Sequence, residues 1–310
     1  MELSFYGAAK DVTGVNFLLT GEKVKILVDC GLVQGSHFFN KQNFQDFGYK
    51  SSEIDYLFVS HAHIDHVGRI PKLYKDGFRG KILCSYPTRD LAEVSLTDGY
   101  RVMEEAIKRV GGQPLYSPAD IDAAMELFHP VEYNKKFKLS GDLVFRMQEA
   151  GHILGSSITE IWLEGQKIVF SGDLGNSPPP MIRQTAVIDE ADYLVIESAY
   201  GDRNHPDVNE RKLLLERTME DVATSKGVLM IPVAAVEKAQ ELLFEMNELI
   251  ENNRVPRIPI FLDSPLADKI TQIYEKYHDY LNDEAKKLIS SGDSIFHFPG
   301  LKFTSSKEES

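Results

Sequence analysis

The sequence has few cysteines and no long apolar run. Cys30 and Cys84 are its only cysteines, and two isolated thiols in apolar surroundings cannot form the disulfide framework of a small secreted domain. No uninterrupted apolar run approaches the ~20 residues that a membrane-spanning helix needs. No signal peptide is visible either, because the first residues lack a basic segment followed by an apolar one. We therefore expect a cytoplasmic protein that does not associate with a membrane.

Positive charge is also scarce. The chain has 34 Lys and Arg against 47 Asp and Glu, which gives a formal net charge of −13. This balance argues against a protein that coats nucleic acid over its whole surface, although it leaves room for a local cationic site. Its 310 residues suggest about two domains, at roughly 150 residues per domain.

The local pattern changes near residue 205. Before it, short apolar stretches such as residues 16–20 are separated by Gly- and Asp-rich turns, which predicts many strands and few helices, one of them over residues 66–74. After it, strands such as residues 227–231 alternate with helices of ten or more residues, which predicts βα units around a parallel sheet. We therefore expect two domains, residues 1–205 and 206–310.

Four candidate metal ligands lie within the six residues H-A-H-I-D-H: His61, His63, Asp65 and His66. Imidazole and carboxylate groups suit cations such as zinc. This loop follows a short apolar run, so a tight turn would aim His61 and His63 at one ion. Asp65 and His66, at the start of the next helix, would aim at a second ion. A polar surface loop is the alternative, but four such side chains seldom coincide at this spacing.

Two further ligand-type residues follow predicted strands. His152 lies in A-G-H after the strand at residues 144–147, and Asp173 lies in F-S-G-D after the strand at residues 167–170. The neighbouring glycines permit close approach of the backbone. Alone, each residue would more often be structural; together with the histidine-rich loop, they indicate a shared metal site.

The order of these motifs resembles the metallo-β-lactamase superfamily: H-A-H-I-D-H, then G-H-I-L-G-S, then S-G-D-L-G. The segments L-V-D-C-G at residues 27–31, E-S-A-Y-G at residues 197–201 and D-S-P at residues 263–265 resemble its β-CASP branch. That branch contains RNA- and DNA-processing nucleases similar to the cleavage and polyadenylation specificity factor nuclease. The resemblance implies an α/β fold, an αββα metallo-β-lactamase sandwich with an inserted α/β β-CASP domain.

The resemblance also implies two Zn²⁺ ions and a role for each matching residue. One zinc would be held by His61, His63 and His152, the other by Asp65 and His66, with Asp173 bridging the two. Asp29 would orient a ligand imidazole through a hydrogen bond, and Asp65 or Glu197 would move protons. A structural role in a turn or cap is the alternative for Asp29 and Glu197. Lys238 and Ser264 are the candidate substrate contacts.

The implied activity is hydrolysis of RNA phosphodiester bonds by a metal-bound hydroxide. The expected substrate is single-stranded RNA, with DNA less favoured, and a homodimer is an option for the full-length form. Two alternatives remain open. One is a thioester or lactam hydrolase of the same superfamily, and the other is a non-catalytic scaffold paralogue in an RNA-processing complex.

Two departures from the family pattern qualify this hypothesis. Family members return to the first domain after the insert and bring a further histidine ligand there, but the sequence reaches Ser310 without it. We therefore expect a C-terminally truncated chain with weak or no activity. In addition, Glu237 and Lys238 stand where the family usually has Gly and Arg. This change removes a bidentate phosphate fork and places a carboxylate that would repel phosphate beside Lys238.

Overall fold

A computed structural model describes residues 1–34, 41–176, 178–204 and 208–304. The chain divides into two units, which are described separately. Unit 1 comprises residues 1–175 and 185–197, and unit 2 comprises residues 176–184 and 198–310. The boundary expected at residue 205 lies outside the described residues, so the limits of the two domains stay a prediction.

The first sheet of unit 1 has an antiparallel and a parallel half. Its strands, in spatial order, are β1 (Glu2–Gly7), β2 (Asn16–Thr20), β3 (Lys25–Val28), β4 (Tyr56–Phe58), β5 (Lys81–Ser85) and β6 (Phe128–Val131). Strands β1 to β3 pair antiparallel, and β3 to β6 pair parallel. Parallel strands are usually covered on both faces, and this explains the continuous apolar run in β3, where Ile26, Leu27 and Val28 are all buried.

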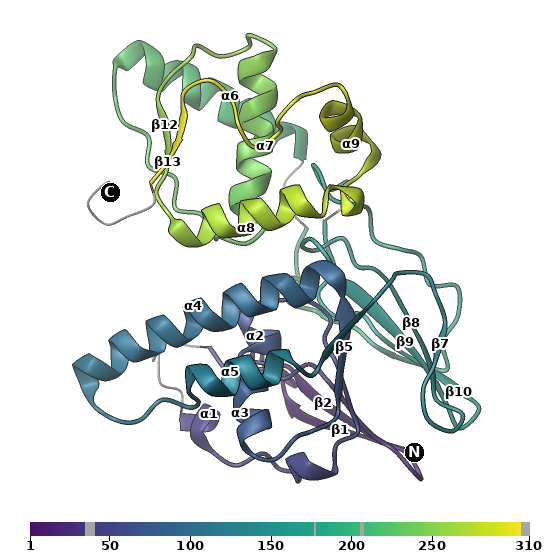
Figure 1. Ribbon diagram of the computed structural model, residues 1–310. Helices are drawn as coiled ribbons and strands as arrows, with labels where there is room; N and C mark the ends of the chain where they lie inside the picture. The colour runs from purple at the N-terminus through teal and green to yellow at the C-terminus, as the bar shows by residue number, and fades with distance from the viewer. Residues whose placement is uncertain (35–40, 177, 205–207, 305–310) are drawn as a thin grey trace. The chain divides into compact units, whose positions relative to one another are not determined.

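Helices lie along one face of this sheet (Figure 1). They are α1 (Lys41–Phe44), α2 (Ile64–Val67), α3 (Ile70–Lys75), α4 (Tyr86–Val110) and α5 (Pro118–Met125), with a 3₁₀ turn at Ser51–Glu53. The single helix expected over residues 66–74 is wrong, because the structure has α2 and α3 with a break at Gly68 and Arg69. Pro71 lies in the first turn of α3, where its missing N–H is tolerated; inside a continuous helix its ring would clash with the preceding turn.

The second sheet of unit 1 packs against the first. Its strands, in spatial order, are β11 (Tyr193–Val195), β10 (Gln166–Phe170), β9 (Ser157–Leu163), β8 (Val144–Glu149) and β7 (Phe137–Lys138). Buried side chains of both sheets form one core, which includes Phe58 from the first sheet and Phe145 and Phe170 from the second. The rings of Phe58 and Phe145 meet edge to face with centroids 4.9 Å apart. Unit 1 is therefore layered as helices, sheet and sheet.

Unit 2 is mainly helical in its described residues. Its elements are α6 (Val208–Ser225), α7 (Lys238–Glu251), β12 (Ile260–Leu262), α8 (Pro265–Lys276), the 3₁₀ turn η2 (His278–Tyr280), α9 (Asp283–Ser290) and β13 (Leu301–Phe303), which pairs parallel with β12. The strand expected at residues 227–231 is wrong. That segment pairs with no strand among the residues that the structure describes, and Val228 and Met230 are 89% and 86% exposed. Across the described parts of the chain, no helix has the length and apolar character needed to cross a membrane.

Both cysteines lie buried in the core of unit 1, and this predicts slow modification of the folded chain. Burial raises the pKa of Cys30 to about 12 and also raises that of Cys84. At pH 8 the thiolate fraction of Cys30 is then about 10⁻⁴, and the thiolate is the reactive form. We expect iodoacetamide to label neither cysteine in the folded protein and both in concentrated urea, as counted by intact mass. Rapid labelling of either residue without urea would contradict this packing.

Candidate metal centre

Three loops, each following a strand of unit 1, carry the candidate ligands. The loop after β4 carries His61 and His63 and runs into α2. The loops after β8 and β10 carry His152 and Asp173. Both β8 and β10 pair antiparallel with β9, so they point the same way and end at the same edge of their sheet. Packing of the two sheets then brings the end of β4 to that edge.

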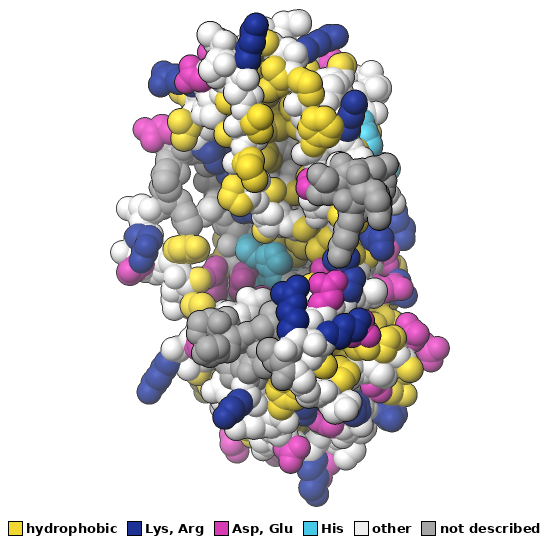
Figure 2. Space-filling model, turned by 90° about the vertical axis from the view of Figure 1, so that its left-hand side faces the viewer, with side chains coloured by type: hydrophobic (Ala, Val, Ile, Leu, Met, Phe, Trp, Pro, Cys, Tyr) yellow, Lys and Arg dark blue, Asp and Glu magenta, His cyan; other side chains and the backbone are white. Residues whose placement is uncertain are grey.

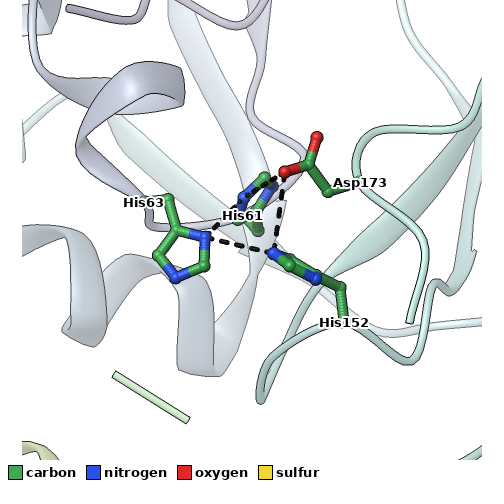
Figure 3. Close-up of side chains that lie close together, drawn as sticks. All are labelled: His61, His63, His152 and Asp173. Atoms are coloured by element: carbon green, nitrogen blue, oxygen red, sulfur yellow. Dashed lines mark hydrogen bonds and ion pairs between the residues drawn. The ribbon is translucent and has the colours of Figure 1, made fainter. Parts of the chain in front are cut away.

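Four of the predicted ligands form one cluster, in which the side chains point toward one another (Figure 3). His61, His63, His152 and Asp173 each offer one ligand atom, and these atoms all lie within 4.8 Å of one another. His63 Nδ1 lies 3.1 Å from the Nε2 atoms of both His61 and His152. Asp173 Oδ2 lies 3.7 Å from His61 Nε2 and 3.6 Å from His152 Nε2.

The spacing of this cluster fits a divalent metal ion. A tetrahedral ion with metal–nitrogen bonds of 2.0–2.1 Å separates its ligand atoms by about 3.3 Å. The four separations given above, 3.1 to 3.7 Å, bracket that value, and all six lie within 4.8 Å. His61 is fully buried, whereas the side chains of His152 and Asp173 are 26% and 32% exposed. Histidine side chains also appear at the molecular surface beside acidic ones (Figure 2). The cluster is therefore anchored in the core and open to solvent on one side.

His66 lies on the other side of Asp173. Its Nδ1 is 2.8 Å from Asp29 Oδ2, and its Nε2 is 3.3 Å from Asp173 Oδ1. The Nε2 atom is buried and makes no hydrogen bond of acceptable geometry among the described residues. Asp173 thus directs one oxygen toward the cluster and the other toward His66, as a carboxylate does when it bridges two ions.

Burial and charge set opposite protonation tendencies for neighbouring imidazoles. Burial, reinforced by the nearby histidines, holds the pKa of His61 well below its usual range, so His61 is neutral and able to bind a metal. Burial also opposes the charged form of His66, but the Asp29 and Asp173 carboxylates outweigh it and raise the pKa of His66 well above its usual range. Burial disfavours ionisation of Asp173, yet its contact with His66 lowers its pKa overall.

The structure places Asp65 and Glu197 close to this centre in different ways. Asp65 lies in α2, and burial, with a smaller contribution from the Asp173 charge, raises its pKa. Glu197 accepts a hydrogen bond from the backbone N–H of Leu174 (3.0 Å), so it holds the residue directly after Asp173. Neither residue belongs to the four-ligand cluster, and their catalytic roles stay predictions.

The two predicted substrate contacts lie in unit 2 and have local partners. Lys238 begins α7 and forms an ion pair with Glu241 (2.8 Å). Ser264 caps α8, where its hydroxyl accepts the N–H of Ala267 (3.1 Å). Glu237 is buried and accepts a hydrogen bond from the Tyr274 hydroxyl, so its carboxylate is turned away from solvent. Binding of RNA by Lys238 and Ser264 stays a prediction.

Sequence reasoning missed two serines that support the ligands. Ser60 contacts Asp29, His61 and His66 through its hydroxyl group. Ser156 accepts the backbone N–H of His152 (3.0 Å) and so fixes the start of that loop. Ser60 directly precedes His61, and Ser156 is the last residue of G-H-I-L-G-S. Their position beside the ligand histidines was the sequence feature that could have identified them.

Close backbone packing at Gly31 and Gly175 accounts for two glycines of the motifs. A Cβ atom on Gly31 would lie 1.4 Å from the carbonyl oxygen of Asp65, and one on Gly175 would lie 1.5 Å from that of Gly151. No side chain fits at either position. The loops that carry the ligands therefore approach one another as closely as backbone atoms permit.

Comparison with known proteins gives matches along most of the chain. The Metallo-beta-lactamase superfamily domain matches residues 18–196, and the Beta-Casp domain matches residues 239–310. Ribonuclease TTHA0252 of Thermus thermophilus is 34% identical over 100% of this chain and 69% of its own length. Cleavage and polyadenylation specificity factor 73 of Drosophila melanogaster is 29% identical over 97% of this chain and 44% of its own length. Transcription termination factor FttA of Methanosarcina mazei is 28% identical over 91% and 45%, respectively.

The opposite pKa shifts of His61 and His66 predict opposite effects on the pH dependence of stability in the metal-free chain. The pKa of His61 is lower in the folded state. Its stabilising contribution is therefore present above the unfolded pKa of ~6.5 and is lost as the pH falls. The pKa of His66 is raised. Its contribution is fully present below ~6.5 and is lost as the pH rises through the folded pKa.

We expect His61→Gln to reduce the loss of unfolding free energy that occurs as the pH falls below about 6.5. We expect His66→Gln to reduce the loss of unfolding free energy that occurs as the pH rises above it. Urea titrations at several pH values with a chelator present would measure both slopes. If both substitutions changed the slope of unfolding free energy against pH in the same direction, these assignments would be contradicted.

Proposed function

Because the chain belongs to the metallo-β-lactamase superfamily and to its β-CASP RNA-processing branch, we propose that it is a zinc-dependent ribonuclease acting on single-stranded RNA in preference to DNA. The position of Asp173 carries this proposal. Its Oδ2 faces His61 and His152, and its Oδ1 faces His66. This arrangement suits two ions that share one carboxylate, as in enzymes that hydrolyse phosphodiesters with two metals.

The donor set favours zinc. His61, His63 and His152 offer neutral imidazole nitrogens, and Asp173 adds an oxygen at a spacing compatible with a tetrahedral ion. Magnesium and calcium prefer sites built from oxygen ligands, which this cluster is not. His66 and Asp65 would hold the second ion with Asp173. The bound ions would lower the pKa of water and offset negative charge on the phosphodiester.

The chain's own residues then have distinct tasks. Asp173 would hold the two metal positions at a fixed separation, and Glu197 would fix Asp173 through the backbone of Leu174. Burial raises the pKa of Asp65, which lies next to the ligands, and Asp65 or Glu197 would move a proton during the reaction. Asp29 accepts a hydrogen bond from the Nδ1–H of His66, which turns Nε2 of that ring toward Asp173, where it would serve as a metal ligand.

The match of the Beta-Casp domain to residues 239–310 favours nucleic acid over a thioester or lactam substrate. The relatives whose names describe an activity are a ribonuclease, a cleavage and polyadenylation specificity factor and a transcription termination factor. The chain spans 44% to 69% of the length of these three. RNA cleavage is therefore proposed for these 310 residues alone, and it should be measured with an assay that detects slow cleavage.

We expect the purified chain to cleave a labelled single-stranded RNA under single-turnover conditions with the protein in excess. His63→Ala and Asp65→Ala should each lower the rate at least about 100-fold, because even groups that only support a ligand contribute 10–100-fold. His129→Ala is the matched control, since this histidine is an exposed residue of β6 with a local backbone contact. Equal rates in His63→Ala and His129→Ala would contradict the proposal, as would hydrolysis of a thioester with RNA left intact.

Metal content separates an enzyme from a scaffold. We expect elemental analysis after equilibrium dialysis against zinc to give about two ions per chain, and His152→Ala to give fewer. A scaffold paralogue would retain less than one ion, and its content would not respond to His152→Ala.

A further inference from the structure

Ser60 is a buried residue that connects two ligand histidines to one carboxylate. It is 2% exposed and lies between the end of β4 and His61. Its hydroxyl oxygen is 2.7 Å from Asp29 Oδ2, 3.0 Å from His61 Nδ1 and 3.3 Å from His66 Nδ1. Its backbone N–H donates to the other Asp29 oxygen, Oδ1, at 2.8 Å. Both carboxylate oxygens of Asp29 are therefore held by the same residue.

The donors and acceptors around Ser60 can be assigned from these distances. An ionised carboxylate only accepts hydrogen bonds, so the single hydroxyl proton of Ser60 belongs on its shortest contact, Asp29 Oδ2. His66 Nδ1 lies 2.8 Å from the same Oδ2 and donates its own proton there. The lone pairs of the Ser60 oxygen are then left for His61 Nδ1, which must be the donor in the 3.0 Å contact.

We propose that Ser60 is a positioning residue that keeps His61 in the tautomer with its proton on Nδ1, so that the Nε2 lone pair faces the metal ligands. In a neutral imidazole, the nitrogen that carries the proton is set by the hydrogen bond that the ring makes. His61 is fully buried, and its Nε2 lies 3.1 Å from His63 Nδ1. Without an acceptor at Nδ1, the proton could move to Nε2 and occupy the position that a metal ion needs.

The support for Ser60 extends into the backbone. Asp29 has a φ of +57°, an unfavourable value for a residue with a side chain, and its N–H is bonded to the carbonyl of Phe58 (2.8 Å). Its carbonyl accepts the side-chain amide of Asn16 (2.9 Å). Asp29 is therefore held by contacts that do not involve Ser60, and Ser60 links that position to His61.

The test measures the tautomer of His61 directly and does not depend on enzymatic activity. The inference itself rests on the metal centre of the proposed function. The chain would be labelled with ¹⁵N-histidine and freed of metal with a chelator. Long-range ¹H–¹⁵N spectra distinguish a protonated from an unprotonated ring nitrogen, and His61→Gln would identify the His61 signals. We expect a protonated Nδ1 and an unprotonated Nε2 for His61. A protonated Nε2 in the unaltered chain would overturn the proposal without any further variant.

Ser60→Ala should shift His61 toward the Nε2-protonated form and weaken zinc binding about 10- to 100-fold in a chelator competition assay. Ser60→Thr restores the hydroxyl group and should recover both properties. Ser157→Ala is the matched control, because Ser157 is also buried and its hydroxyl bonds only the backbone carbonyl of Ser60 among the contacts seen (3.1 Å). An unchanged tautomer in Ser60→Ala, or an equal loss of zinc affinity in Ser157→Ala, would show that the hydroxyl of Ser60 has no such role. Because these readouts are independent of RNA, a chain that cleaves no RNA would still test this inference.

Discussion

The metal centre depends on one buried carboxylate, that of Asp29. An ionised group that is only 1% exposed is costly unless donors surround it. Asp29 has three donors in the structure: the backbone and hydroxyl groups of Ser60 and the Nδ1 of His66. Because these donors lie on the segment that follows β4, satisfying the charge of Asp29 also places His61 and His66. Removal of Asp29 would therefore affect the ligands before it affected any metal.

The acidic composition of the chain has a local explanation at this site. Asp29, Asp65 and Asp173 lie among imidazoles, of which His61 has a strongly lowered pKa. A site of this kind is negative or neutral on its own and becomes cationic only with divalent ions. The net charge of −13 thus argues against RNA binding over the whole surface and is compatible with RNA bound at a metal centre.

The sequence predicted ligand-type side chains, four of which cluster in the structure, and the resemblance implied that Asp29 orients a ligand imidazole, but neither identified Ser60 or the imidazole that Asp29 contacts. His61, His63, His152 and Asp173 lie in the loops that follow β4, β8 and β10, and the strand ends of packed sheets meet at one edge. Asp29 and His66 are 37 positions apart, and their contact depends on tertiary packing that no local pattern reveals. The apolar pattern of residues 66–74 favoured one helix, but Pro71 indicated a helix start near that position, where the structure has the break between α2 and α3. Residues 227–231 have the composition of a strand, but a strand also needs a neighbour to pair with, and composition does not supply one.

The spacing of the histidines also explains why this site should bind metal in competition with protons. His63 Nδ1 lies 3.1 Å from two other imidazole nitrogens, His61 Nε2 and His152 Nε2. Three lone pairs facing one another at that distance repel, so either a proton or a metal ion must lie among them. Since Ser60 and Asp29 keep protons on the far sides of His61 and His66, the shared proton is left to His63 and His152, the more exposed members. A metal ion can take the place of this proton when the His63 ring carries its proton on Nε2 instead of Nδ1, so metal binding requires a change of tautomer in the more exposed half of the site while the buried half stays unchanged.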